Sequence, residues 1–253
     1  MIKLNNHIIN VTVFPDKTSQ VWKINTSILE HTVNCIKWDF ENEGEFLQVA
    51  QLVDLIRSLS KARITLWMEY LPYARQDKEV SNATTFALPT FCKLLDSLNV
   101  DHIVTVDVHS DVPKKLLKTN FTNLVPLSTI ERIADKLNTD YIVCPDKGAT
   151  ARYSTQINYP FITMNKERNQ LTGELKMSGV VEKEVNLSNK SVLIVDDICD
   201  GGGTFILAAK ELHRLGVKEV NLYVSHGIFS KGTTILEEAG IKNIYTKDGK
   251  VLD

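Results

Sequence analysis

The sequence predicts an α/β protein with mostly parallel sheets. Strand-like runs alternate with helical runs almost throughout the 253 residues. Repeated strand–helix units of this kind form parallel sheets with helices on both faces. Three charged clusters, "DVHS", "PDKG" and "DDICDGGG", each directly follow a strand-like run. Ligands of such sheets bind beyond the carboxyl ends of the strands, so the clusters predict where a site lies.

Apolar spacing and turn residues predict the elements of the first half. Strands are expected at 21–24, 33–38, 63–70 and 102–108. Apolar residues at helical spacing predict an amphipathic helix over 45–60. A second helix is expected over 84–98, with Pro89 marking a kink or a late start. The segment between the 63–70 strand and this helix contains "LPYARQDK", which its proline and its charges predict to be a loop.

The second half continues the alternation. Strands are expected at 141–144, 161–164, 192–195 and 219–225, and helices over 128–137, 148–157 and 204–215. Ser128 is expected to cap its helix, with Glu131 three residues on. Gly216 is a C-terminal stop signal. Residues 165–179 have much charge and little apolar periodicity, so we expect a long mobile loop there.

Composition narrows the functional class. The net charge is −2, with 29 basic and 31 acidic residues, which argues against a non-specific nucleic-acid binder. The four cysteines stand far apart without a C-x-x-C pair, which indicates reduced thiols rather than disulfides or a zinc site. No segment approaches the roughly 18 apolar residues of a membrane span, and the N-terminal segment "MIKLNNHIIN" lacks a signal peptide's apolar core. We therefore expect a cytoplasmic protein that binds neither membrane nor nucleic acid.

The most informative stretch is Leu193–Phe205, "LIVDDICDGGGTF". Three glycines and Thr204 at a helix start expose backbone N–H groups to an anion such as phosphate. Asp196 and Asp197 would repel a phosphate, but they suit sugar hydroxyls or a metal-bound water. A ribose 5-phosphate satisfies both halves. An isolated Asp-Asp pair is more often a solvated turn, and the three glycines before a helix favour the ligand instead.

This stretch resembles the phosphoribosyl-pyrophosphate-binding motif of type I phosphoribosyltransferases and ribose-phosphate pyrophosphokinases. The resemblance implies a ribose 5-phosphate site made by Asp196, Asp197, Asp200, Gly201, Gly202, Gly203 and Thr204. The match departs at Gly201, where these families usually have a small hydroxyl residue, so one side-chain donor to the phosphate is missing. Cys199 replaces a usual aliphatic residue, which is a milder change.

Further segments resemble the pyrophosphokinases in particular. They are "YLPYARQDK" (70–78), "VDVHS" (106–110), "CPDKGATAR" (144–152), "NKERNQ" (165–170) and "YVSHGIFSKG" (223–232). The resemblance runs in register from about residue 14 to about residue 246. It implies two tandem phosphoribosyltransferase-like domains of type I. Residues 1–124 would hold the ATP-binding segment and residues 125–253 the ribose 5-phosphate loop, with the active site between them.

The resemblance also implies roles for individual residues. ATP would be bound by Phe14, Asp16, Arg75, Gln76, Asp77 and His109. His109 and Asp146 would ligate Mg²⁺, and Lys166 and Arg168, on a loop that closes over the site, would be catalytic. In this family Phe14 and Asp16 reach the adenine of a neighbouring subunit, so a homo-oligomer, a dimer or a hexamer, is expected.

Other interpretations stay open at this stage. Lys166 and Arg168 could be two solvated loop charges, and Phe14, beside Val13 and Pro15, could be a core residue. Tyr70 and Tyr73 are expected to pack rather than bind, and the role of His226 is undecided. The chain could also be a type I phosphoribosyltransferase or a non-catalytic regulatory homologue. The presence of His109, Lys166 and Arg168 argues against a non-catalytic homologue, because such proteins usually lose these groups.

The chain departs from the pyrophosphokinase pattern in several places. After Lys78 the family continues with basic residues, whereas this chain has Glu79, Val80, Ser81, Asn82 and Ala83. Thr18 stands where an acidic residue is common. The sequence begins close to the adenine-contacting segment and stops short of a helix that commonly returns to the first domain. We therefore expect a smaller interface and weaker control by phosphate and ADP.

Overall fold

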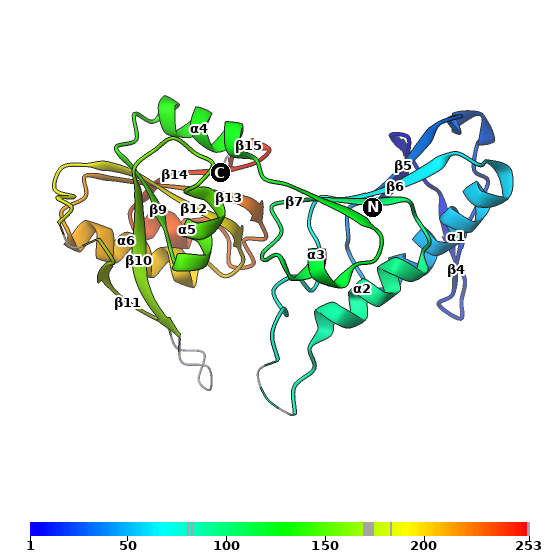
Figure 1. Cartoon of the computed structure of the whole chain (residues 1–253), viewed down its shortest axis with the longest axis horizontal. Coiled ribbons are helices and arrows are strands. Elements are labelled where there is room, and N and C mark those ends of the chain that lie inside the picture. Colours follow the sequence, from blue (N-terminus) through cyan, green and yellow to red (C-terminus); the bar gives the residue numbers. More distant parts are fainter. Residues whose placement is uncertain (80, 82, 169–174, 183, 252–253) are drawn as a thin grey trace. The chain divides into compact units, whose positions relative to one another are not determined.

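The structure is a computed structural model that describes residues 1–79, 81, 83–168, 175–182 and 184–251. The chain divides into two compact units, Met1–Val125 and Pro126–Asp253, and each is described by itself (Figure 1). The boundary expected from the sequence lies between residues 124 and 125. Each unit contains one sheet with mostly parallel strands, which confirms the α/β class. No helix of the described residues is long and apolar enough to span a membrane.

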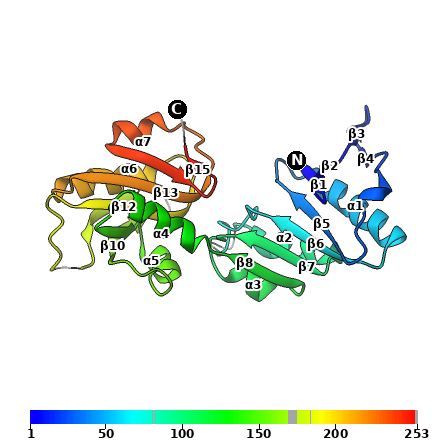
Figure 2. The same cartoon turned by 90° about the horizontal axis from the view of Figure 1, so that it is seen from above.

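The first unit is built on a six-stranded sheet with the order β2-β1-β5-β6-β7-β8. Its strands are β1 (Ile2–Leu4), β2 (His7–Ile8), β5 (Val33–Trp38), β6 (Arg63–Met68), β7 (His102–Val106) and β8 (Asn120–Leu124). Strands β5 to β8 are parallel, and β1 and β2 are antiparallel additions at one edge. A separate hairpin of β3 (Val11–Val13) and β4 (Ser19–Val21) lies beside the first long helix (Figure 2).

Two long helices of this unit cover the same face of the sheet. The helices are α1 (Glu45–Leu59), α2 (Ala87–Ser97) and the short α3 (Val112–Leu116), with a 3-10 turn at Thr26–Ile28. Apolar residues of α1 and α2 share one buried cluster with Ile36, Leu66 and Ile103. Because β5, β6 and β7 are added in one direction, right-handed crossovers place both helices on one face. The expectation of helices on both faces is therefore wrong for this sheet, where Lys37 and Trp67 on the other face are half-buried.

Several predicted boundaries of this unit change, and two of them have clear local reasons. The helix expected from residue 84 begins at Ala87, so Pro89 falls in its first turn, where a missing N–H costs nothing. The late start is confirmed. The strand expected at 21–24 is wrong beyond Val21, where β4 ends. Lys23 adopts a positive φ of 52°, which an extended strand excludes.

The second unit holds a seven-stranded sheet with the order β11-β10-β9-β12-β13-β14-β15. Its strands are β9 (Tyr141–Cys144), β10 (Phe161–Arg168), β11 (Leu175–Val180), β12 (Ser191–Cys199), β13 (Glu219–Gly227), β14 (Ile241–Thr246) and β15 (Gly249–Lys250). All neighbouring pairs are parallel except those that β11 and β15 make. Its helices are α4 (Leu127–Lys136), α5 (Lys147–Tyr153), α6 (Gly203–Arg214) and α7 (Thr234–Glu238).

The direction of strand addition reverses inside this sheet. From β9 the chain passes through α5 to β10, on one side of β9, whereas β12 continues through α6 to β13, on the other side. Right-handed crossovers in opposite directions place their helices on opposite faces. Residues of α6 and α7 accordingly share a buried cluster that α5 does not join. Figure 2 shows α7 and α5 on opposite sides of the sheet.

Three expectations for this unit are corrected. The mobile loop expected at 165–179 is in its described parts an antiparallel hairpin, because β10 runs to Arg168 and β11 begins at Leu175. Residues 169–174 lie outside the described residues. Asp196 and Asp197 lie within β12 instead of after it. Helix α4 starts at Leu127 without a side-chain cap, so Ser128 is not its cap.

Candidate active site

The reversal of strand direction creates a binding position in the second unit. Strands β9 and β12 are neighbours, and their chains diverge to opposite sides of the sheet. At such a switch point the two connections leave a crevice outside the carboxyl ends of the strands. Asp146 follows the end of β9, and the acidic glycine loop of residues 196–204 closes β12 and opens α6. Two of the three charged clusters therefore meet at one place.

Asp146 is held as a carboxylate at the start of α5. It is the N-cap residue, and its Oδ1 accepts a hydrogen bond from the backbone N–H of Ala149 at 3.0 Å. Its Oδ2 forms an ion pair with Nζ of Lys166 at 3.0 Å. Burial alone would raise the pKa of Asp146, but the Ala149 N–H and the Lys166 charge lower it overall. Lys166 therefore points into the site from β10, and the reading of it as a solvated loop charge is wrong.

The adjacent aspartates of β12 have different surroundings. Asp197 is 3% exposed, and its Oδ1 pairs with Nη1 of Arg152 at 2.8 Å. Asp196 is half-buried, and its Oδ1 accepts the backbone N–H of Asp197 at 3.0 Å. Burial and the neighbouring Asp197 charge raise the pKa of Asp196 well above its usual range, against the opposing charge of Arg152. One aspartate is thus fixed by a cation, and the other is the better proton acceptor.

The glycine loop has the backbone that its sequence predicts. Gly202 has a φ of 73°, and a Cβ there would lie 3.0 Å from Cδ2 of Leu236, so this position favours glycine. Helix α6 starts at Gly203, which places Thr204 in its first turn. The first N–H groups of a helix have no intrahelical partner and carry the positive end of the dipole. The loop therefore presents donors suited to an anion.

The hairpin of β10 and β11 carries the two expected catalytic residues. Lys166 pairs in register with Met177, and Arg168 pairs with Leu175 next to the end of the described hairpin. The backbone of Arg168 is described, whereas its side chain lies outside the described part of the chain. Of the two expected catalytic residues, Lys166 is therefore the one whose described side chain contacts another site residue, Asp146.

In the first unit, the expected ATP-binding loop follows β6. Tyr73 has a positive φ of 64°, unusual for a bulky residue, and its ring packs 4.9 Å from the ring of Phe91. The carbonyl of Tyr73 accepts the N–H of Gln76 at 2.8 Å, which closes a tight turn. Arg75 and Gln76 are exposed on this turn, and Asp77 is half-buried. Strained backbone is found at ligand sites in many proteins, and the ATP-binding role of this turn stays a prediction.

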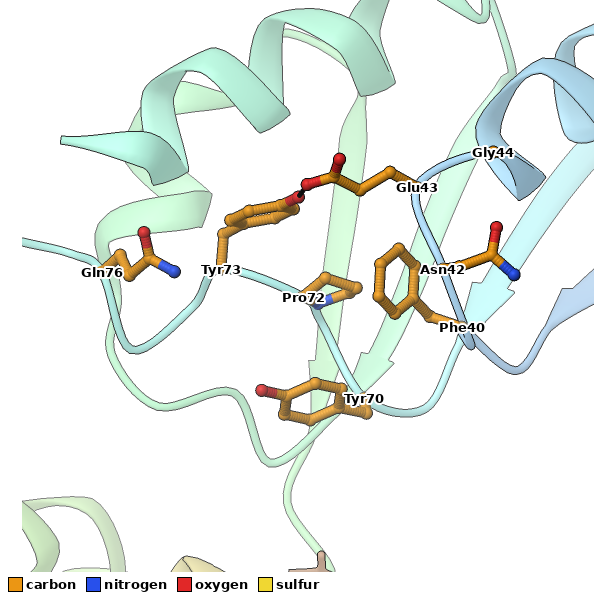
Figure 3. Close-up of a pocket in the computed structure, with 8 residues that line it drawn as sticks. All are labelled: Phe40, Asn42, Glu43, Gly44, Tyr70, Pro72, Tyr73 and Gln76. Carbon is orange, nitrogen blue, oxygen red and sulfur yellow. Dashed lines mark hydrogen bonds between the residues drawn. The ribbon is translucent and has the colours of Figure 1, made fainter. Parts of the chain in front are cut away.

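A pocket of about 510 Å³ opens beside the same loop. Figure 3 shows the rings of Phe40, Tyr70 and Tyr73 around Pro72, with the amide of Gln76 at the side. Aromatic walls with a few polar groups are typical of small-molecule sites. The pocket therefore adds apolar contact area beside the expected ATP-binding residues.

His109 lies in the loop that follows β7, as its position in "VDVHS" predicts. Asp107, fully buried, has a positive φ of 45°, and its N–H donates to the carbonyl of Leu124 at 2.9 Å. The N–H of Val108 donates to Oδ1 of Asn123 at 2.9 Å. These bonds fix the loop at the carboxyl end of the sheet, with His109 half-buried on it.

Phe14 and Asp16 lie at the tip of the β3–β4 hairpin. Phe14 is 42% exposed, so the reading of it as a core residue is wrong. Asp16 accepts hydrogen bonds from the hydroxyl and the backbone N–H of Thr18, at 2.7 and 3.1 Å, and these bonds lower the pKa of Asp16. Thr18, which departs from the family pattern, thus holds Asp16 in place. The hairpin presents an aromatic ring and a carboxylate outward.

Metal ligands are sparse in both units. Among the described residues, no group of three or more His, Cys, Asp or Glu side chains could hold a metal ion. The two expected Mg²⁺ ligands belong to different units, His109 to the first and Asp146 to the second. A metal site built by protein ligands alone is therefore not found in the described parts of either unit.

Comparison with known proteins decides the family. A family model described as "Phosphoribosyl transferase domain" matches residues 127–248. A ribose-phosphate pyrophosphokinase of Saccharolobus solfataricus is 28% identical over 250 residues, which cover 96% of this chain and 83% of that protein. One of Pyrococcus abyssi is 30% identical over 240 residues, which cover 91% and 81%. The chain belongs to the ribose-phosphate pyrophosphokinase family.

A solved structure shares the fold of this chain. The crystal structure of phosphoribosylpyrophosphate synthetase from Mycobacterium smegmatis matches with a TM-score of 0.76 and 20% sequence identity. The match covers 94% of this chain and 79% of that chain. The fold of that synthetase, with its mostly parallel α/β architecture, therefore extends over nearly the whole chain.

Sequence reasoning missed two residues that the structure places at this candidate site. Arg152 lies inside the quoted segment "CPDKGATAR", and its charge six residues after Asp146 was the available signal. Ser230 donates its hydroxyl hydrogen to Oδ1 of Asp200, a residue of the glycine loop, at 2.7 Å. No local sequence pattern indicates this contact. His226, undecided from the sequence, is buried near the end of β13 in register with Ile198.

Proposed function

We propose that the protein is a ribose-phosphate diphosphokinase. It transfers the diphosphoryl group of ATP to the 1-hydroxyl of D-ribose 5-phosphate, giving 5-phosphoribosyl 1-diphosphate and AMP. The observation that carries this proposal is the acidic glycine loop at the switch point of the second sheet, in a chain of the pyrophosphokinase family.

Ribose 5-phosphate would bind along the 196–204 loop. Backbone N–H groups of Gly201, Gly202 and Gly203 would hold the 5-phosphate at the positive end of α6, with the hydroxyl of Thr204. The carboxylates of β12 would accept hydrogen bonds from the vicinal hydroxyls of the sugar. The glycines of the loop would thus bind the phosphate group, and the aspartates would bind the two sugar hydroxyls. Asp200 would complete the loop through its bond with Ser230.

ATP would bind to the first unit. Arg75 would stack on adenine or pair with phosphate, Gln76 and Asp77 would complete the turn, and the aromatic pocket lies beside them. Phe14 and Asp16, exposed on the β3–β4 hairpin, would reach the adenine of a neighbouring subunit. This arrangement requires a homo-oligomer, which we propose to be a dimer or a hexamer.

The residues present fit a magnesium ion that would be held together with the substrate. Mg²⁺ is commonly held by one or two carboxylates together with substrate phosphates and water, so a cluster of three protein ligands is not required. The lowered pKa of Asp146 keeps a hard oxygen ligand ionised. Asp146 would therefore hold the ion, with His109, and the bound ion would supply positive charge to the polyphosphate oxygens.

The chain's own residues would then position the reactants and balance charge. The 1-hydroxyl oxygen attacks the β-phosphorus of ATP, the bond from the β-phosphorus to the α,β-bridging oxygen breaks, AMP leaves and the hydroxyl proton is released. Negative charge gathers on crowded oxygens during this step. Lys166, held 3.0 Å from Asp146, would turn to the polyphosphate when it binds, and Arg168 would add a second cation. Their place on a hairpin suits groups that close over a bound substrate.

One assay separates this proposal from its alternatives. Incubation with ATP, Mg²⁺ and ribose 5-phosphate should release AMP in proportion to enzyme. A type I phosphoribosyltransferase would release none but would consume 5-phosphoribosyl 1-diphosphate when a nucleobase is supplied. A regulatory homologue would do neither and would bind the ligands only. We propose that the reaction takes place in the cytoplasm and involves no membrane or nucleic-acid partner.

A further inference from the structure

The turn that follows β13 is fastened against the glycine loop. The backbone N–H groups of Ile228 and Phe229 both donate to the carbonyl of Cys199, at 2.8 and 3.1 Å. The turn closes on itself where the N–H of Gly232 donates to the carbonyl of Phe229 at 2.8 Å. Next along the turn, Ser230 holds Asp200 by a bond of 2.7 Å. The turn and the loop are therefore one connected structure, although about 30 residues separate them along the chain.

Lys231 extends its side chain over Gly201. A Cβ added at Gly201 would lie 3.7 Å from Cε and 3.8 Å from Cδ of Lys231. The lysine stem thus lies beside the position where the side chain of a serine or threonine would begin. One further bond of about 1.5 Å leads from Cε to the ammonium group, so that group can lie within about 5 Å of the same position. Lys231 is exposed and forms no ion pair with any residue that the structure describes.

The charge balance of the loop calls for such a cation. Asp196, Asp197 and Asp200 all lie in the stretch that would hold the sugar phosphate, and of these Asp197 already pairs with Arg152. A phosphate monoester carries about −1.5 to −2 charges at neutral pH, whereas a helix N-terminus supplies only about half a positive charge. Gly201 provides no hydroxyl donor where related loops usually have one. The ammonium group of a lysine brings three donors and a full positive charge.

We propose that Lys231 is a binding residue for the 5-phosphate of ribose 5-phosphate and replaces the hydroxyl missing at Gly201. The inference rests on the proposed function, since it names a further residue of that same site. It predicts that the phosphate is gripped from two sides, by the start of α6 and by the turn after β13. It also predicts that a hydroxyl restored at residue 201 makes Lys231 less important for binding.

The test measures ribose 5-phosphate binding separately from turnover. Lys231→Met should raise both the Kd from titration calorimetry and the KM for ribose 5-phosphate about 10-fold, the scale of one charge-assisted hydrogen bond. The KM for ATP, the value of kcat and the melting temperature should change little. Lys210→Met is the matched control, because this exposed lysine lies on α6 but about 9 Å further along the helix than Thr204. It should leave the Kd unchanged.

A rescue experiment completes the test. A Cβ at Gly201 meets only ordinary van der Waals contacts, so Gly201→Ser should fold normally. In the Lys231→Met background it should recover most of the lost affinity, which a general loss of charge would not allow. Wild-type affinity in Lys231→Met, or no recovery with the serine, would overturn the role of Lys231 and leave the proposed function standing. A wild-type protein that neither binds ribose 5-phosphate nor forms AMP would overturn both.

Discussion

The loss of Arg152 is predicted to destabilise the second unit strongly. Its side chain is 15% exposed and that of Asp197 is 4% exposed, so the pair lies out of water. At their separation of 2.8 Å, an effective dielectric constant of about 20 gives an attraction of about 6 kcal/mol. Most of that attraction offsets the desolvation of the two charges. Arg152→Met removes the attraction and leaves the desolvated carboxylate behind.

The cost follows from what Asp197 then does. It can stay charged without a partner, which typically costs about 3–5 kcal/mol. It can instead take up a proton on folding. From a carboxyl pKa of about 3.9 in the unfolded chain, protonation costs about 4 kcal/mol at pH 7, or 1.36 kcal/mol for each pH unit. We therefore expect Arg152→Met to lose about 4 kcal/mol at pH 7, a large part of the 5–15 kcal/mol typical of a domain.

Urea unfolding of the wild type and the variant, followed by circular dichroism, measures this difference. Because the folded variant binds a proton that the unfolded chain releases, its deficit should shrink by about 1.4 kcal/mol per unit as the pH falls from 7 to 5. The double variant Arg152→Met with Asp197→Asn removes both charges and should recover at least half of the loss. A deficit below 1 kcal/mol that does not change with pH, or a double variant no more stable than the single one, would refute the reasoning.

Three further predictions concern the site and its frame. Lys166→Ala should lower kcat by orders of magnitude in the AMP assay while leaving the melting temperature within a few degrees. The control Lys176→Ala, on the facing strand, should leave kcat unchanged. Equal turnover of the two variants would remove Lys166 from the mechanism. Gly202→Ala should destabilise the protein by about 2 kcal/mol in chemical unfolding, because its φ is 73° and the added Cβ would lie too close to Leu236. In the control Gly203→Ala the added Cβ meets no atom within 4 Å, so this change should be neutral or slightly stabilising. Equal effects of the two changes would contradict the left-handed turn at Gly202. Asp96 accepts hydrogen bonds from two backbone N–H groups and one hydroxyl. Burial raises the pKa of Asp96, but these hydrogen bonds lower the pKa overall. The stability that Asp96 adds is therefore present above about pH 4, the pKa of an unfolded aspartate, and is lost as the pH falls through the lower pKa of the folded state. In thermal melts, Asp96→Ala should therefore cost about 1–3 kcal/mol at pH 7 and clearly less in acid, where the carboxyl is protonated. A gap of undiminished size in acid would count against this bond pattern.

Elements with an apolar face could be predicted from the sequence, and elements without one could not. The helix expected over 45–60 is α1 (Glu45–Leu59), because its buried residues recur at helical spacing. The β10–β11 hairpin was missed, because backbone hydrogen bonds between antiparallel strands leave no apolar period in a charged segment. The same limit explains why Asp196 and Asp197 were placed after β12. A strand can run past the end of its apolar pattern when a neighbour continues the ladder, and β13 does so here.

The candidate site also has a part that the sequence predicts and a part that it does not predict. The loop of residues 196–204 could be located because glycines, a helix start and a strand end lie together in the sequence. The contacts of Arg152 and Lys231 could not be predicted, because their partners are 45 and 30 residues away along the chain and no periodicity links them. Only the fold of the sheet brings these side chains to the carboxyl ends of β9 and β12.

The fate of the γ-phosphorus of ATP tests the account most directly. With ATP labelled at that position, Mg²⁺ and ribose 5-phosphate, we expect the label to appear in a sugar diphosphate, with one AMP formed for each labelled product. Label recovered as free phosphate or diphosphate, ADP in place of AMP, or no label on the sugar at all would contradict diphosphoryl transfer by this protein.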